Sequence, residues 1–176
     1  MSTFGKAILY GLLALVIAVF ALNRRIQEGR ILPALAPLLQ FCMPVDDLYA
    51  PVMCEPIDVS GDTKTFEYTF TNRYVGAHAF GVLAQGLSQN VAEATIPKFA
   101  LSVEFVVDGY QVLSAEVEDP AYNFWTRYGD GYAYVCYDVP FEVPVGKAVH
   151  CRVKVTRADP EFQARHRPVT VYAGRE

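Results

Sequence analysis

The stretch FALSVEFVVDGYQVLSAEV, residues 99–117, decides the fold. In its first half, apolar residues such as Leu101 and Val103 alternate with polar residues, which is the period of a half-buried strand. Asp108-Gly109 then supplies the composition that a type I′ turn requires, and a second strand pattern follows it. The sequence therefore predicts an antiparallel hairpin made of Phe99–Val107 and Tyr110–Val117.

The same alternation recurs on both sides of this hairpin, separated by turn residues. We expect further strands at Thr65–Thr71, Gly76–Gln85, Tyr132–Val139, Ala148–Thr156 and Pro168–Tyr172. Short strands with little helix are typical of a single antiparallel β-sandwich, with an immunoglobulin-like or a jelly-roll-like strand order. The Cys-Trp-Cys spacing of a true immunoglobulin domain is missing, because Trp125 falls in a stretch that reads as a loop.

A second feature precedes this all-β body. The run Ala7–Leu22 is apolar and uncharged, and it reaches membrane-spanning length when it is extended back to Phe4 with Lys6 at the headgroups. Arg24 and Arg25 end it. We predict one N-terminal transmembrane helix that acts as an uncleaved signal-anchor, the alternative being a cleaved signal peptide.

The orientation signals conflict. Lys6 is outnumbered by Arg24, Arg25 and Arg30, which favours a cytoplasmic C-terminal side. The early position of the apolar run, the cysteines and the β-rich body favour export. We expect a single-pass protein whose C-terminal domain lies outside the cytoplasm, in the periplasm or the extracellular space.

These patterns divide the chain into residues 1–30 as the anchor, 31–56 as a Pro-rich linker and 57–176 as the β-sandwich. The linker begins with an apolar segment that Pro33 and Pro37 interrupt. We expect this segment to pack on the domain, the alternatives being contact with the membrane interface or with a partner protein. From Cys42 to Pro56 the density of prolines predicts an irregular, extended path.

Charge and metal-ligand spacing exclude several function classes. From Ile31 onward the chain holds 18 acidic and 11 basic residues, a balance of −7 that repels phosphate backbones, so we expect no nucleic-acid partner. The three histidines, His78, His150 and His166, are widely spaced and the cysteines form no C-x-x-C pair, so we expect neither a metal site nor a cofactor.

Four cysteines in an exported chain permit two disulfides. If Tyr132–Val139 and Ala148–Thr156 are antiparallel neighbours, Cys136 comes nearly opposite Cys151. Cys42 with Cys54 is then the complementary pair. The competing interpretation is that some of these residues are buried thiols.

The sequence contains only weak candidates for a group of catalytic residues. Asp130, Asp138 or Glu142 with a histidine is conceivable as an acid–base pair, and Cys54 with His78 or His150 as a nucleophile and its base. None has a recognisable catalytic flank, so we expect a protein that is not an enzyme and that has no small-molecule ligand.

The aromatic connection of residues 121–132, AYNFWTRYGDGY, is the best candidate binding stretch. Exposed rings beside an arginine concentrate binding energy at protein interfaces. The predicted partner-binding residues are Tyr122, Phe124, Trp125, Arg127 and Tyr128. In the competing interpretation the rings bury themselves at one end of the sandwich.

These expectations together favour a membrane-anchored, non-enzymatic module that binds a protein partner, as an accessory or assembly subunit of a bacterial-type envelope complex. Two alternatives stay open. One is a periplasmic enzyme inhibitor or immunity-type protein with a protruding acidic loop, and the other is a carbohydrate-binding module that uses the rings.

Overall fold

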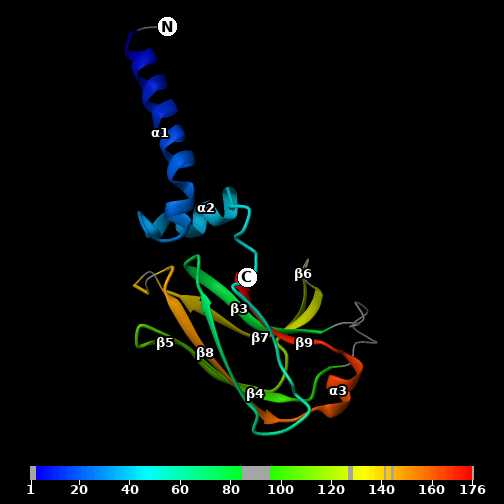
Figure 1. Cartoon of the computed structure of the whole chain (residues 1–176). Coiled ribbons are helices and arrows are strands. Elements are labelled where there is room, and N and C mark those ends of the chain that lie inside the picture. The colour runs from blue at the N-terminus through cyan, green and yellow to red at the C-terminus, as the bar shows by residue number, and fades with distance from the viewer. Residues whose placement is uncertain (1–2, 85–95, 127–128, 141, 144, 176) are drawn as a thin grey trace. The chain divides into compact units, whose positions relative to one another are not determined.

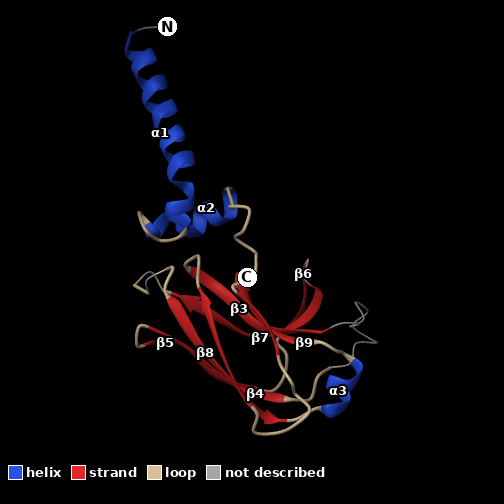
Figure 2. Ribbon diagram, viewed as in Figure 1, coloured by secondary structure: helices blue, strands red, loops and turns tan. Residues whose placement is uncertain are grey.

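A computed structural model of the chain describes residues 3–84, 96–126, 129–140, 142–143 and 145–175. The chain divides into two compact units, Met1–Leu48 and Tyr49–Glu176. The described part of the first is helical, and that of the second consists mostly of strands (Figures 1 and 2). The elements are α1 (Thr3–Gln27), η1 (Pro33–Leu35), α2 (Ala36–Cys42), β1 (Met53–Pro56), β2 (Thr65–Thr71), β3 (Gly76–Ala84), β4 (Ala100–Val107), β5 (Tyr110–Val117), β6 (Tyr122–Thr126), β7 (Gly129–Val139), β8 (Ala148–Arg157), α3 (Pro160–Arg165) and β9 (Val169–Arg175).

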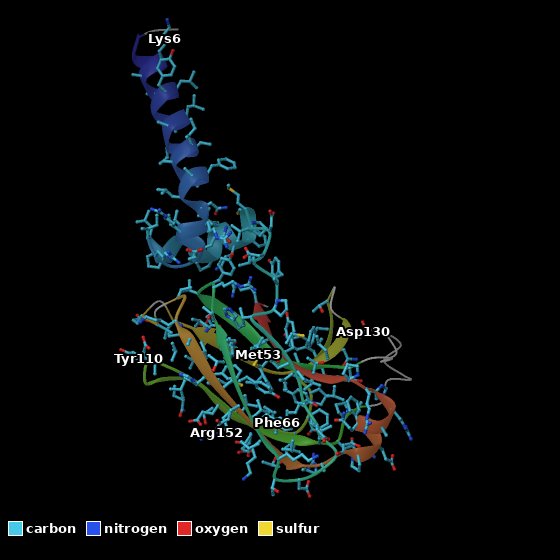
Figure 3. The ribbon with its side chains drawn as sticks, in the orientation of Figure 1. Lys6, Met53, Phe66, Tyr110, Asp130 and Arg152 are labelled. Atoms are coloured by element: carbon cyan, nitrogen blue, oxygen red, sulfur yellow. The ribbon has the colours of Figure 1, made fainter. Side chains whose placement is uncertain are left out.

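The first unit is built on α1, which contains no proline and whose apolar residues from Ala7 to Ala18 are exposed on all sides, while Ile26 near its end is buried. Its part from Gly5 to Gln27 is long and apolar enough to cross a membrane. Lys6 lies close to its N-terminal end (Figure 3). The predicted N-terminal apolar helix is therefore confirmed, while the side of the membrane on which the chain continues stays a prediction.

The apolar start of the presumed linker forms the helical elements η1 and α2, although two prolines interrupt it. Pro33 and Pro37 stand in the first turns of η1 and α2, where a missing backbone N–H costs no helical hydrogen bond. Within the first unit α2 packs on α1. At the other end of the presumed linker, Met53–Pro56 forms β1. The division at residues 30 and 56 stays a prediction.

In the described part of the second unit, nine strands form two antiparallel sheets. The five-stranded sheet has the order β1-β9-β3-β7-β6, and the four-stranded sheet has the order β2-β8-β4-β5 (Figure 1). The predicted strand Thr65–Thr71 is found with those bounds. The β4–β5 hairpin is confirmed, and Asp108 (φ 46°) and Gly109 (φ 84°) both have the positive φ of a type I′ turn.

Side chains from both sheets meet in one hydrophobic core. Phe105 of β4 lies at its centre, with ring centroids 5.8 Å from Phe80 of β3, 5.2 Å from Tyr137 of β7 and 5.2 Å from Phe70 of β2. Alternation along each strand makes this possible, since every second side chain points to the same face. A mostly β domain of two antiparallel sheets is therefore confirmed.

Two elements were not expected. The residues Tyr122–Thr126, which read as part of a loop, form β6. Helix α3 follows β8, and its N-terminus is capped by Asp159, whose Oδ1 accepts a hydrogen bond from the backbone N–H of Phe162 at 2.9 Å. The Asp-Pro pair at residues 159–160 is a helix start signal, with Pro160 in the first turn.

The predicted disulfide between Cys136 and Cys151 is wrong. Strand β7, which carries Cys136, pairs with β3 and β6, whereas β8, which carries Cys151, pairs with β2 and β4. The two cysteines therefore belong to different sheets, although their strands are neighbours in sequence. All four cysteines, Cys42 and Cys54 included, are free thiols in this structure.

Candidate functional site

The predicted binding stretch forms one edge of the five-stranded sheet. Strand β6 pairs with β7 in a register that places Tyr122 opposite Ala133 and Phe124 opposite Gly131. Tyr122 and Phe124 are two residues apart, so both side chains lie on the same face of β6. Asp130 lies at this hairpin, at one end of the sheet (Figure 3).

Phe124 lies flat against the sheet and is half-buried. Its ring centroid is 5.3 Å from that of Tyr172 on β9, which was not among the predicted residues. A Cβ added at Gly81 or at Gly131 would stand 3.0 Å from the Phe124 ring, so these glycines leave the space in which the ring rests. A glycine inside a strand marks such a close approach, so Gly81 and Gly131 were the signal in the sequence that could have revealed the packing of the Phe124 ring.

Tyr122 is the more accessible of the two rings, with 38% of its surface exposed. Its hydroxyl lies 3.8 Å from Sγ of Cys136 on the neighbouring strand. Tyr122, Phe124 and Tyr172 together make up what we call the aromatic surface. Val171 and Ala173, the neighbours of Tyr172 on β9, belong to the hydrophobic core, so the Tyr172 side chain points to the opposite face of the sheet.

The other predicted binding residues are less fully described. The backbone of Trp125 pairs with Asp130, but its side chain lies outside the described part of the structure, as do Arg127 and Tyr128. Partner binding by these residues therefore stays a prediction.

The later tyrosines of the stretch turn inward. Tyr132 and Tyr134 belong to the hydrophobic core. Burial raises the pKa of the Tyr134 hydroxyl, which has no hydrogen-bond partner among the residues that the structure describes. The interpretation that the rings bury themselves thus holds for these two residues.

The composition of β6 separates it from the other edge strands of the two sheets. Edge strands usually carry charges or prolines, which prevent a further strand from pairing with them. Accordingly β1 contains Glu55 and Pro56, β2 contains Glu67, and β5 contains Glu116. The sequence of β6, YNFWT, contains neither a charge nor a proline.

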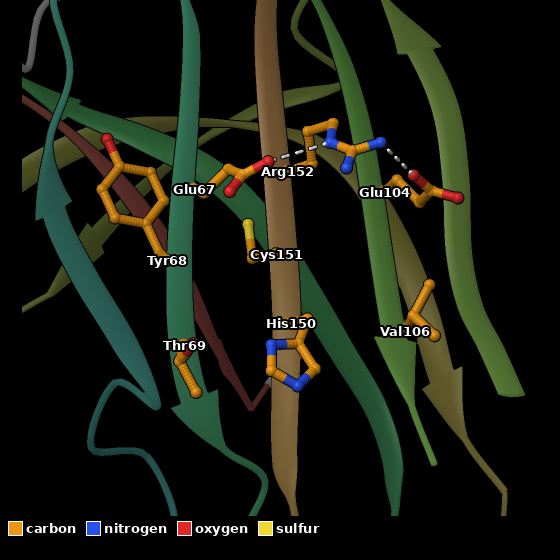
Figure 4. Close-up of a pocket in the computed structure, with 8 residues that line it drawn as sticks. All are labelled: Glu67, Tyr68, Thr69, Glu104, Val106, His150, Cys151 and Arg152. Atoms are coloured by element: carbon orange, nitrogen blue, oxygen red, sulfur yellow. Dashed lines mark hydrogen bonds and ion pairs between the residues drawn. The ribbon is translucent and has the colours of Figure 1, made fainter. Parts of the chain in front are cut away.

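A second feature, not predicted from sequence, is a hollow of about 370 Å³ on the four-stranded sheet (Figure 4). Arg152 lies between two carboxylates there, 3.4 Å from Glu67 and 3.7 Å from Glu104. All three side chains are well exposed, so each ion pair contributes ~0–1 kcal/mol to stability. The lining residues are Glu67, Tyr68, Thr69, Glu104, Val106, His150, Cys151 and Arg152.

The structure does not bring the conceivable nucleophile and base together. Cys54 lies on β1 and His78 on β3, with β9 between them, and His150 lies in the other sheet. Burial, and then the charge of Glu55, raise the pKa of the Cys54 thiol, which opposes formation of a thiolate.

His78 is almost completely buried in the second unit. Its Nδ1 lies 2.8 Å from the carbonyl oxygen of Gly76, and its ring stacks on Tyr137 with centroids 5.4 Å apart. Burial lowers the pKa of this imidazole to about 4, so it is neutral at pH 7. A neutral, stacked imidazole in this position has a structural role.

The acidic candidates are also dispersed. Asp130 and Asp138 both lie on β7, eight residues apart, which corresponds to roughly 26 Å of strand. Among the residues that the structure describes, no group of three or more His, Cys, Asp or Glu side chains is placed to hold a metal ion.

Comparison with known proteins supports the fold alone. No family model matches the chain, and no curated protein matches it. The fold is similar to that of a protein from Sulfurospirillum deleyianum known from a crystal structure, with a TM-score of 0.51 and 7% sequence identity. The match covers 70% of this chain and 96% of that protein.

Proposed function

We propose that this protein is a membrane-anchored, non-enzymatic β-sandwich module that binds a protein partner, as an accessory or assembly subunit of a cell-envelope complex. The observation that carries the proposal is β6, an uncharged edge strand whose outward face bears Tyr122 and Phe124. Tethering such a module by α1 raises its effective concentration at the membrane surface.

The strand pairing favours the jelly-roll order over the immunoglobulin-like one. One long antiparallel ribbon, folded at the β4–β5 turn, accounts for four of the strand pairs. These are β1 with β9, β2 with β8, β3 with β7 and β4 with β5. The pairs β3–β9 and β4–β8 roll this ribbon into two sheets. These pairings support our proposal of a jelly roll, in which β6 is an added strand.

The proposed mode of binding is strand addition. An extended segment of the partner would run along β6, with main-chain hydrogen bonds providing affinity. Tyr122 would then act as an aromatic anchor, supported by the packing of Phe124 on Tyr172. We place the module outside the cytoplasm, in the periplasm or the extracellular space, because the apolar helix stands at the start of an otherwise β-rich chain.

A photo-crosslinking amino acid tests this proposal in intact membranes. Incorporated at Tyr122, it should give one discrete adduct, and at Tyr110, a more exposed tyrosine at the start of β5, it should give none. Tyr122→Ala should weaken capture of that adduct's partner without lowering the unfolding midpoint. Equal crosslinking at both positions would contradict the proposal.

The hollow on the four-stranded sheet favours one alternative, carbohydrate recognition. Its carboxylates, guanidinium and imidazole are groups that hydrogen-bond sugar hydroxyls. Binding to a glycan array that is lost in Arg152→Ala but kept in Tyr122→Ala would favour this alternative over partner binding at β6.

A further inference from the structure

The first unit carries an apolar surface that α1 does not use. On η1 and α2 the side chains of Leu32, Leu35, Leu38 and Phe41 are exposed, Phe41 by 85%. From Leu35 onward they recur every third residue, so successive members are rotated by only ~60° around the helix and form one stripe. We call this set the apolar stripe. Its neighbourhood in sequence, Ile31–Met43, contains no charged residue.

The opposite face of α2 is fastened to the end of α1. Ala36, Leu39 and Gln40 are buried there. The carbonyl oxygen of Met43, just after α2, accepts hydrogen bonds from Asn23 Nδ2 at 3.0 Å and Gln27 Nε2 at 2.7 Å. Gln40 Nε2 in turn donates to the carbonyl oxygen of Gln27 at 3.2 Å. The position of α2 along α1 is thereby fixed.

That position is the boundary between the apolar and the polar part of α1. The uncharged run ends at Leu22, and the contacts to α2 begin at Asn23. Charged groups gather at the same level: Arg24 pairs with Glu28 at 3.1 Å and with Asp47 at 3.2 Å. If α1 spans a bilayer, this level coincides with the headgroups.

We infer that α2 is an interfacial helix, whose apolar stripe enters the boundary between the headgroups and the acyl chains beside α1. The inference rests on the proposed membrane anchor. An apolar helix face is stable ~5–10 Å into that boundary, while arginines and carboxylates at the same level remain hydrated. The stripe and the apolar residues of α1 before Asn23 are both exposed, so a bilayer that takes up α1 would also be in reach of the stripe.

Depth-dependent tryptophan quenching tests the inference on the full chain. The natural tryptophan is replaced by Trp125→Phe, and single tryptophans are introduced by Phe41→Trp and, independently, by Leu38→Trp. The proteins are reconstituted in phosphatidylcholine vesicles that carry bromine either near the glycerol end or near the methyl end of the acyl chains. We expect the shallow bromines to quench most of the emission of both tryptophans, and the deep bromines to quench little of it. Both tryptophans should also emit at shorter wavelength in the vesicles than in the protein unfolded in denaturant without detergent.

Two matched positions make the result decisive. Ile17→Trp, at mid-helix in α1, should be quenched most by the deep bromines, and Asp46→Trp, on the polar side of the same unit, by neither kind. Quenching at Ile17→Trp without quenching at Phe41→Trp and Leu38→Trp would overturn the interfacial helix and keep the anchor. Shallow quenching at Phe41→Trp without deep quenching at Ile17→Trp would overturn the span alone, and loss of both would overturn both.

Discussion

Cys136 and Cys151 lie on strands that are consecutive in sequence, yet Cys136 pairs with Ala79 in one sheet and Cys151 with Phe105 in the other. The connection between β7 and β8 therefore crosses from sheet to sheet. This relationship excludes a cross-strand disulfide between the two cysteines and leaves them with different reactivities.

We predict that three thiols react with a maleimide in the folded protein and that the fourth reacts only after denaturation. Cys42, Cys54 and Cys136 are exposed, whereas Cys151 is buried and burial raises its pKa to about 12. Intact-mass spectrometry before and after urea treatment counts the labels. Four labels in the native protein, or a mass that indicates a disulfide, would contradict the structure.

Phe105→Ala should destabilise the second unit by about 3–5 kcal/mol, because it leaves a cavity where three rings meet. The free energy of unfolding, measured by urea titration of the full chain in detergent micelles, provides the test. Tyr110→Ala is the control, since this exposed tyrosine should change stability by less than about 0.5 kcal/mol. Similar losses for both variants would place Phe105 outside the core.

Replacing glycine by alanine at two positions should lower stability for different reasons and by different amounts. A Cβ at Gly81 would overlap the backbone carbonyl of Tyr132 and press on Phe124, so Gly81→Ala should cost about 1–3 kcal/mol or more. Gly109→Ala meets no neighbouring atom and should cost about 1–2 kcal/mol through its positive φ alone. Phe124→Ala should therefore relieve part of the loss in Gly81→Ala and none of the loss in Gly109→Ala, as measured by thermal unfolding.

His78 should make stability depend on pH in mildly acidic solution. Burial lowers the pKa of its imidazole from 6.5 to about 4, with Arg175 contributing in the same direction and Asp138 opposing it. Above pH 6.5 the imidazole is neutral in both the folded and the unfolded chain, so the free energy of unfolding has its full value. Between pH 6.5 and pH 4 the unfolded chain binds a proton that the folded chain does not, so the free energy of unfolding falls, by about 3 kcal/mol in total.

The variant His78→Gln should remove most of this slope while it keeps a side chain that can hydrogen-bond to Gly76. Urea titrations of both proteins at several pH values between 4 and 7 measure the slope. An unchanged slope in His78→Gln would assign the pH dependence to other groups.

The local alternation of apolar and polar residues was sufficient to predict the strands that have one buried face. The alternation in β2, β4 and β8, and the Asp-Gly turn between β4 and β5, are short-range signals, and the structure reproduces them. Strand β6 was not predicted because two of the three aromatic residues in the sequence YNFWT are adjacent, so the sequence shows no clean period of two.

Long-range pairing could not be predicted in the same way. Nothing in a single sequence shows that β9 inserts between β1 and β3, or that β7 and β8 separate into different sheets. Those choices depend on which faces meet in the core, as at Phe80 and Phe105. The supporting role of Tyr172 beneath Phe124 was hidden for the same reason, since 48 residues separate the two rings in sequence.

Among the described strands β9, the last in sequence, lies between β1 and β3 in the five-stranded sheet. The sheet therefore has a gap until Val169–Arg175 has been synthesised, and in the described part of the sheet β1 has no other partner. Folding of this unit must wait for that strand, so a premature stop shortly before Val169 would yield a polypeptide with an open, adhesive sheet rather than a shortened domain.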